Sequence, residues 1–108
     1  MAIEISRLYE FGKYGLDVAS RVLFRDEQAV ALPPKAVELL AALVEQSGEV
    51  VSKKELMGRL WPDAFVEDAN LTQNIFLLRK VFGEDGSGQK LIETNPRRGY
   101  RFVADVRL

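Results

Sequence analysis

The hydrophobic pattern of this chain changes its period once, at the dipeptide Pro33-Pro34. Before it, short apolar and aromatic runs are separated by Gly12, by Asp17 and by the polar residues 26–28. Such spacing is typical of a small antiparallel meander, predicted here over about residues 9–32. After it, apolar residues recur every three or four positions, as on one side of a helix. The chain therefore predicts an α+β fold, with a sheet first and helices after it.

Three helices are predicted, over about residues 33–46, 52–61 and 69–82. The two prolines supply a fixed-φ start for the first. Its apolar stripe consists of Val37, Leu40, Ala41 and Val44, widened by Leu39 and Leu43. Ser52 and Glu55 predict a capping box at the start of the second, in which each side chain accepts from the other's backbone N–H. Leu56 and Leu60 would form its buried edge, and Pro62 would end it.

The third helix has an unusual outer face. Leu71, Ile75, Leu78 and Phe82 fall on one narrow stripe, which should face the core. The opposite side then consists of Ala69, Gln73, Phe76, Leu77 and Lys80. An ordinary surface helix would carry charged residues where Phe76 and Leu77 stand, so these two side chains should be covered by something.

A hairpin with basic residues at its tip is predicted over about residues 90–104. Two extended runs, residues 91–94 and 100–103, are joined by Asn95-Pro96-Arg97-Arg98-Gly99. The turn-rich residues 83–88 should end the third helix before it. Tyr100 and Phe102 alternate with Arg101, which predicts rings that pack inward.

Composition excludes several functions. The chain has no cysteine or histidine, which removes disulfides, thiolate nucleophiles, most zinc and iron sites and the usual general base. It also has no glycine-rich phosphate loop and no nucleophile elbow, so we expect no enzyme, no cofactor and no metal. The most apolar stretch, residues 36–44, is too short for a bilayer, and residues 1–10 lack the apolar h-region expected of a signal peptide. A single cytoplasmic domain over residues 1–108 is expected.

Charge is divided unevenly along the chain. Residues 1–68 carry eight Lys/Arg and twelve Asp/Glu, whereas residues 69–108 carry seven and four, within a net charge of −1. A bipolar domain of this kind could present one face to phosphates. Charge alone gives equal support to the alternative that the uneven division arose by chance on a solvated surface.

Several ordered blocks resemble one known family. They are residues 32–40 (LPPKAVELL), 48–56 (GEVVSKKEL), 60–62 (LWP), 70–75 (NLTQNI), 78–80 (LRK) and 96–102 (PRRGYRF). The chain resembles the OmpR/PhoB-type effector domain, in the branch of CadC-like and ToxR-like regulators, from roughly residue 9 to 103. The resemblance implies a winged helix-turn-helix with a four-stranded N-terminal sheet, three helices and a C-terminal β-hairpin wing.

It also implies a function, sequence-specific binding of double-stranded DNA in transcription regulation. The third helix would enter the major groove and the wing the adjacent minor groove. Such domains bind direct repeats as tandem dimers, and residues 61–68 match a segment that in the family can touch RNA polymerase. Trp61 itself is expected to anchor that loop. This chain departs from the family at Ala69, Phe76 and Leu77, where basic residues are frequent.

The DNA-contacting residues predicted on these grounds are Asn70, Thr72, Gln73, Asn74, Phe76, Leu77, Arg79, Lys80, Arg97, Arg98, Lys53 and Lys54. Gln73 is the leading base reader, because glutamine can pair bidentately with adenine. A phosphate contact is predicted for Arg79 in preference to an internal salt bridge, and minor-groove contacts for the two wing arginines. Thr72 and Asn74 contact phosphate or water, and Lys53 and Lys54 contact phosphate or are simply solvated.

One alternative function stays open. Phe76 and Leu77 would lie against a thymine methyl or a deoxyribose, or they would be buried by the wing or by another subunit. In the second case the domain would be a protein-interaction module that contacts a partner through these residues and never touches DNA.

Overall fold

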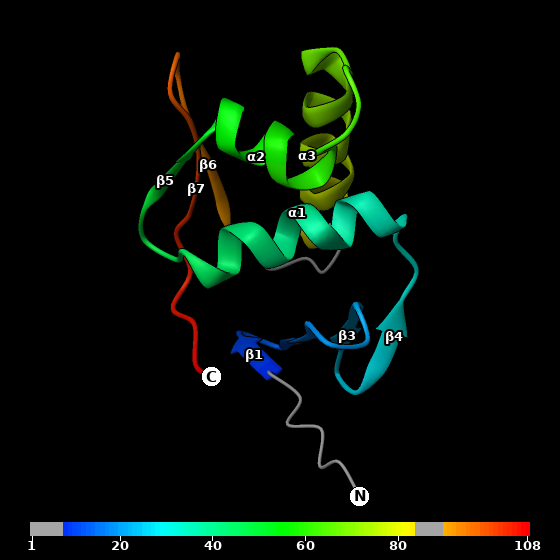
Figure 1. Ribbon diagram of the computed structural model, residues 1–108. Coiled ribbons are helices and arrows are strands. Elements are labelled where there is room, and N and C mark those ends of the chain that lie inside the picture. The colour runs from blue at the N-terminus through cyan, green and yellow to red at the C-terminus, as the bar shows by residue number, and fades with distance from the viewer. Residues whose placement is uncertain (1–7, 84–89) are drawn as a thin grey trace, which may run out of the picture.

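The computed structural model describes residues 8–83 and 90–108, and its elements follow the predicted order (Figure 1). In chain order they are β1 (Leu8–Phe11), β2 (Tyr14–Asp17), β3 (Val22–Arg25), β4 (Gln28–Val30), α1 (Pro34–Glu45), β5 (Val50–Ser52), α2 (Lys53–Leu60), α3 (Asp68–Gly83), β6 (Ile92–Asn95) and β7 (Gly99–Phe102). The turn-rich connection was predicted over residues 83–88. Only Gly83, the last residue of α3, belongs to the described residues, and the rest of this connection lies outside them. None of the helices within the two described ranges has the length and apolarity needed to cross a bilayer.

The N-terminal sheet is the predicted four-stranded antiparallel meander, in the order β1-β2-β3-β4. Strands β1 and β2, and strands β3 and β4, are joined by two-residue turns with positive φ. Gly12 follows β1 with a φ of 58°, and Asp26 and Glu27 both have positive φ between β3 and β4. Positive φ at both central residues is the type I′ geometry that matches the twist of two-residue hairpins.

Helix α1 is buried on almost every side, more than one apolar stripe would require. Every residue from Ala36 to Val44 is buried except Glu38. The helix lies between two layers, with the N-terminal sheet on one side and α2 and α3 on the other (Figure 1). A helix covered on opposite sides needs apolar residues around most of its circumference. This explains why Ala36 and Ala42, which lie outside the predicted stripe, are buried as well.

The start of α2 confirms half of the predicted capping box. The backbone N–H of Glu55 donates to Ser52 Oγ at 3.0 Å, so Ser52 is the N-cap. The Glu55 carboxylate, however, accepts a hydrogen bond from Gln46 Nε2 at 2.7 Å. Within the described residues no hydrogen bond joins the Ser52 N–H to this carboxylate, so the reciprocal half of the box was a wrong prediction: Glu55 ties α2 to the end of α1.

The wing is part of a three-stranded sheet, and the sequence analysis missed its third strand. β7 pairs with β6 on one side and with β5 on the other. In residues 50–52 the sequence predicts only the N-cap of the next helix, because three residues are too few to establish an alternating pattern. Tyr100 and Phe102 on β7 are buried, as predicted. The extra strand fastens the wing to the connection between α1 and α2.

Gly99 permits this pairing. An ideal Cβ at this residue would lie 1.9 Å from the Val51 carbonyl oxygen and 2.9 Å from the Ser52 Cα. These are backbone atoms of the facing strand, so they cannot move aside without separating β5 from β7.

We expect Gly99→Ala to lower the free energy of unfolding by about 2 kcal/mol or more, because overpacking against backbone forces strands apart. Gly58→Ala is the matched control. Gly58 lies inside α2, where an added methyl group would meet nothing within 4 Å, and the substitution should raise stability by about 0.5 to 1 kcal/mol. Denaturant unfolding followed by circular dichroism measures both, and equal stabilities for the two variants would contradict the close approach.

Candidate nucleic-acid interface

Helix α3 buries the side that the sequence predicted. Leu71, Ile75, Leu78 and Phe82 are its buried residues. They pack into the core with α1 and α2, which fixes the orientation of the helix about its own axis. The predicted outer face is therefore the one that the protein presents outward.

The predicted contact residues of α3 lie on or beside that face. Asn70, Thr72, Gln73, Phe76, Arg79 and Lys80 are exposed, and Asn74 and Leu77 are half-buried. Phe76 keeps 60% of its surface exposed, so neither the wing nor any other described part of the chain covers it. Leu77 is less exposed than Phe76, so it contributes the smaller part of the apolar surface on the outward face of α3.

Most of the short polar side chains of α3 bond to backbone carbonyls of their own helix or of the residue just before it. Asn74 Nδ2 donates to the Asn70 carbonyl at 2.8 Å, Thr72 Oγ1 to the Asp68 carbonyl at 3.4 Å, and Asn70 Nδ2 to the Glu67 carbonyl at 3.3 Å. Within the described part of the chain, the Gln73 amide has no such partner. Its two donors and its acceptor are free to meet a ligand.

Arg79 is joined to the wing. Its Nη2 donates to the Ile92 carbonyl at 3.2 Å and to Thr94 Oγ1 at 2.6 Å, both on β6. The predicted alternatives for this residue were a phosphate contact and an internal salt bridge. In the free domain its guanidinium instead bonds to neutral oxygen atoms of the neighbouring strand.

The wing tip is a tight turn with two exposed arginines. The Arg98 N–H donates to the Asn95 carbonyl at 3.1 Å, and Arg97 occupies the left-handed region with a φ of 68°. Pro96 followed by a residue of positive φ is the pattern of a type II turn, in which glycine or asparagine is favoured at the second position. An arginine there costs about 1 to 2 kcal/mol in backbone energy.

The start of α2 lies beside this turn. The Lys53 N–H donates to the Arg98 carbonyl at 3.2 Å, which brings Lys53 and Lys54 close to the wing arginines. Both lysines are exposed in the first turn of α2, where the helix dipole adds partial positive charge. Two pairs of cationic side chains, one from α2 and one from the wing, therefore gather at one end of the domain.

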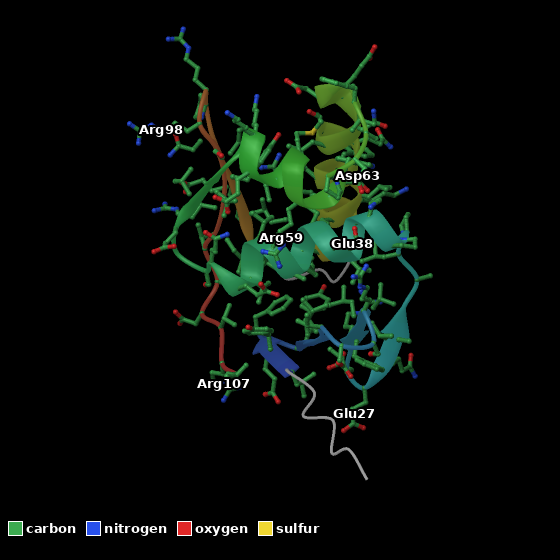
Figure 2. All side chains as sticks on the ribbon, viewed as in Figure 1. Glu27, Glu38, Arg59, Asp63, Arg98 and Arg107 are labelled. Carbon is green, nitrogen blue, oxygen red and sulfur yellow. The ribbon has the colours of Figure 1, made fainter. Side chains whose placement is uncertain are left out.

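The opposite end of the molecule carries charges of both signs. Figure 2 shows Arg98 at the opposite end of the molecule from Glu27 and Arg107. The charged residues that line a hollow of about 570 Å³ on the N-terminal sheet are four acids and one lysine: Glu10, Asp17, Asp26, Glu27 and Lys13. The same sheet region carries Arg21 and Arg25, so the spatial asymmetry of the fold lies in the gathered cations of the wing tip and α2.

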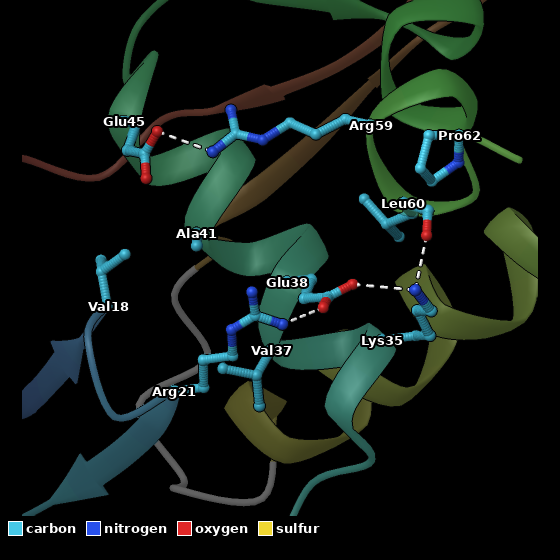
Figure 3. Close-up of a pocket in the computed structure, with 10 residues that line it drawn as sticks. All are labelled: Val18, Arg21, Lys35, Val37, Glu38, Ala41, Glu45, Arg59, Leu60 and Pro62. Carbon is cyan, nitrogen blue, oxygen red and sulfur yellow. Dashed lines mark hydrogen bonds and ion pairs between the residues drawn. The ribbon is translucent and has the colours of Figure 1, made fainter.

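Charges between the two ends are paired. In the cavity of about 310 Å³ beside α1, Glu38 accepts from Arg21 and Lys35, and Glu45 lies 2.7 Å from Arg59 (Figure 3). Each cation that lines this cavity has an acidic partner, which distinguishes it from the basic end. No cluster of acidic side chains that could hold a metal ion occurs in the described ranges.

The connection between α2 and α3 exposes an aromatic side chain that the sequence analysis did not single out. Phe65 is fully exposed, while Trp61 is half-buried and packs against the core. Lys35 helps to hold this end of α2, since its Nζ lies 2.5 Å from the Leu60 carbonyl and 5.9 Å from the Trp61 ring centre. The predicted anchoring role of Trp61 agrees with this position.

Comparisons with known proteins agree with the geometry. The family model described as "Transcriptional regulatory protein, C terminal" matches residues 27–102. Transcriptional regulator HilA of Salmonella typhimurium is 42% identical over 84 residues, 78% of this chain. Transcriptional activator CadC of Escherichia coli is 34% identical over 83 residues, 76% of this chain. The chain spans only 15% of HilA and 16% of CadC.

A solved structure extends the likeness to the fold. The DNA-binding domain of E. coli CadC superposes with a TM-score of 0.82 at 27% identity, over 95% of this chain and 98% of that domain. Its four-stranded N-terminal sheet, three helices and C-terminal hairpin have counterparts here. The chain therefore belongs to the transcriptional regulatory protein family just named, as an OmpR/PhoB-type winged-helix domain similar to those of HilA and CadC.

Proposed function

We propose that this domain binds double-stranded DNA in a sequence-specific manner to regulate transcription, with α3 in the major groove and the wing in the minor groove. One observation carries the proposal. The outward face of α3 presents an amide at Gln73 that has no hydrogen-bond partner within the described residues, and the neighbouring wing ends in two exposed arginines, one held at positive φ. An amide reads base edges and guanidinium groups favour narrow minor grooves.

The remaining predicted contacts divide by chemistry. Lys80, Lys53 and Lys54 are exposed cations and would contact phosphates, which position the protein on the duplex. Asn70, Thr72 and Asn74 bond to helix carbonyls, so they offer their remaining polar atoms to phosphate or water. The cations of the wing tip and of α2 lie at one end, so the domain would approach DNA with that end first.

Two further partners follow from the family resemblance and belong to the same proposal. The domain would bind direct repeats as a tandem dimer, and the loop over residues 61–68 would touch RNA polymerase, with Phe65 as its exposed side chain. A segment that binds DNA in this way would lie in the bacterial cytoplasm.

The rival function is protein binding through Phe76 and Leu77 without DNA. The exposure of Phe76 favours it, but Leu77 is half-buried, and two residues offer little apolar area beside the polar groups around them. Phe76 instead suits contact with the C5-methyl group of thymine, an apolar feature of the major groove.

We expect the double variant Arg97→Asn, Arg98→Ala to lose affinity for specific and random DNA alike, because it removes two charges from the wing tip. Asparagine tolerates the left-handed region, so the melting temperature should not fall. Fluorescence anisotropy over a series of salt concentrations measures the affinity. Arg107→Ala, at the opposite end of the molecule, is the control for the loss of an arginine. Unchanged DNA affinity in the wing variant would contradict a wing contact.

Gln73→Ala should lower affinity for a preferred site about 5- to 150-fold and affinity for random DNA much less, since a good bidentate base contact contributes about 1 to 3 kcal/mol. The preferred site is first obtained by selecting genomic fragments with the purified domain. Gln28→Ala, on the exposed β4 strand, is the matched control. Equal losses on both kinds of DNA would remove Gln73 as a base reader.

Replacing thymine with deoxyuridine in the preferred site should weaken binding by the native domain at one or more positions, because deoxyuridine lacks the C5-methyl group. Phe76→Ser should bind thymine and deoxyuridine sites equally. A Phe76→Ser variant with unaltered affinity and unaltered thymine preference would remove Phe76 as the thymine contact, whereas failure of the native domain to bind any fragment at low salt would favour the protein-binding function.

A further inference from the structure

The bond between Arg79 and the wing joins two elements that must meet DNA together. Arg79 Nη2 reaches both the Ile92 carbonyl and Thr94 Oγ1 on β6. An arginine side chain loses rotamer freedom when hydrogen bonds fix it in one conformation. For that reason an exposed arginine on α3 would ordinarily extend into water. Here the guanidinium lies along the wing, and both hydrogens of Nη2 are used there.

The position of Thr94 makes this bond a support for the wing tip. Thr94 pairs with the buried Tyr100 and directly precedes Asn95, whose carbonyl closes the turn that carries Arg97. Fixing Thr94 therefore fixes the base of the turn.

The two strands of the hairpin are held differently. β7 lies in the middle of its sheet and is fastened to β5, and the Arg98 carbonyl accepts from Lys53. β6 is an edge strand. Its outer side is linked to α3 through Arg79, so this side chain completes the support that backbone pairing begins.

We propose that Arg79 is a positioning residue that holds the wing at a set distance and orientation from the outward face of α3. The inference rests on the DNA binding proposed above. Arg79 acts through Thr94: affinity for DNA depends on the bond between them and not on the positive charge of Arg79. Lys80 remains on the same helix as a cation for phosphate.

Two variants separate the bond from the charge. Arg79→Lys keeps the charge but loses the planar geometry that serves both acceptors. Thr94→Val keeps the shape and changes no charge. With the full chain and a selected DNA fragment, each should weaken binding about threefold to tenfold, as for a partly exposed hydrogen bond to a charged group. The slope of log affinity against log salt concentration should stay unchanged, because no phosphate contact is lost.

The double variant and a footprint complete the test. Arg79→Lys with Thr94→Val should bind no more weakly than the weaker single variant, since both remove one bond. Hydroxyl-radical protection in the minor groove at the wing should decrease while major-groove methylation protection persists. Arg59→Lys is the matched control, because Arg59 bonds to Glu45 between α1 and α2, away from the wing.

The opposite results overturn the proposal. If Arg79 contacts phosphate in the complex, Thr94→Val releases its guanidinium, and affinity stays the same or rises while Arg79→Lys has little effect. Such a result leaves the proposed DNA binding intact. Failure of the native chain to bind any fragment at low salt would instead overturn DNA binding, and the positioning role with it.

Discussion

Four aromatic rings hold the described parts of this domain together. Phe11, on β1, lies 5.6 Å from Tyr14, 6.0 Å from Phe82 and 5.0 Å from Phe102, measured between ring centres, and Tyr14 lies 5.0 Å from Phe82. The rings come from the N-terminal sheet, from the last turns of α3 and from β7. A buried ring of this size stabilises the fold by about 1.5 to 3 kcal/mol, and favourable ring geometry adds to it. The helix and the wing are therefore both placed by a sheet at the other end of the molecule.

That arrangement places the cations of the wing tip and of α2 far from the N-terminal sheet. The sheet region, residues 8–32, carries four acidic and three basic residues, whereas Lys53, Lys54, Arg97 and Arg98 meet at the opposite end. The overall charge of −1 conceals this cluster of cations. A domain whose cations gather at one end approaches a polyanion with that end first, which matters more for recognition than the total charge.

The sequence predicted the elements whose patterns are long. The stripe of α3 spans more than three turns, so its buried residues and its outer face followed from helical period alone. The basic tip followed from two adjacent arginines in a turn. Short or long-range features could not be predicted in the same way. β5 has three residues and is defined by its partner β7, and the Glu55 carboxylate bonds to Gln46 at the end of another helix.

The same distinction applies to the candidate interface. The residues of α3 and of the wing tip were predicted as contacts, but nothing in the sequence indicates which of them are engaged within the protein. The partner of Arg79 lies 15 residues away on another element. The isolation of Gln73 becomes visible only when the neighbouring asparagines and Thr72 are seen to bond to helix carbonyls. Phe65 gave no periodic signal, since it lies in an irregular loop.

The side chains of the wing turn take little part in the fold. Pro96, Arg97 and Arg98 are exposed, while the strands on either side are fastened to α2 and α3. Substitutions at the tip therefore encounter weak selection from folding, and those in the strands encounter strong selection. A lineage of regulators built on this domain can diverge in target preference by changing the tip while the scaffold beneath it is inherited unaltered.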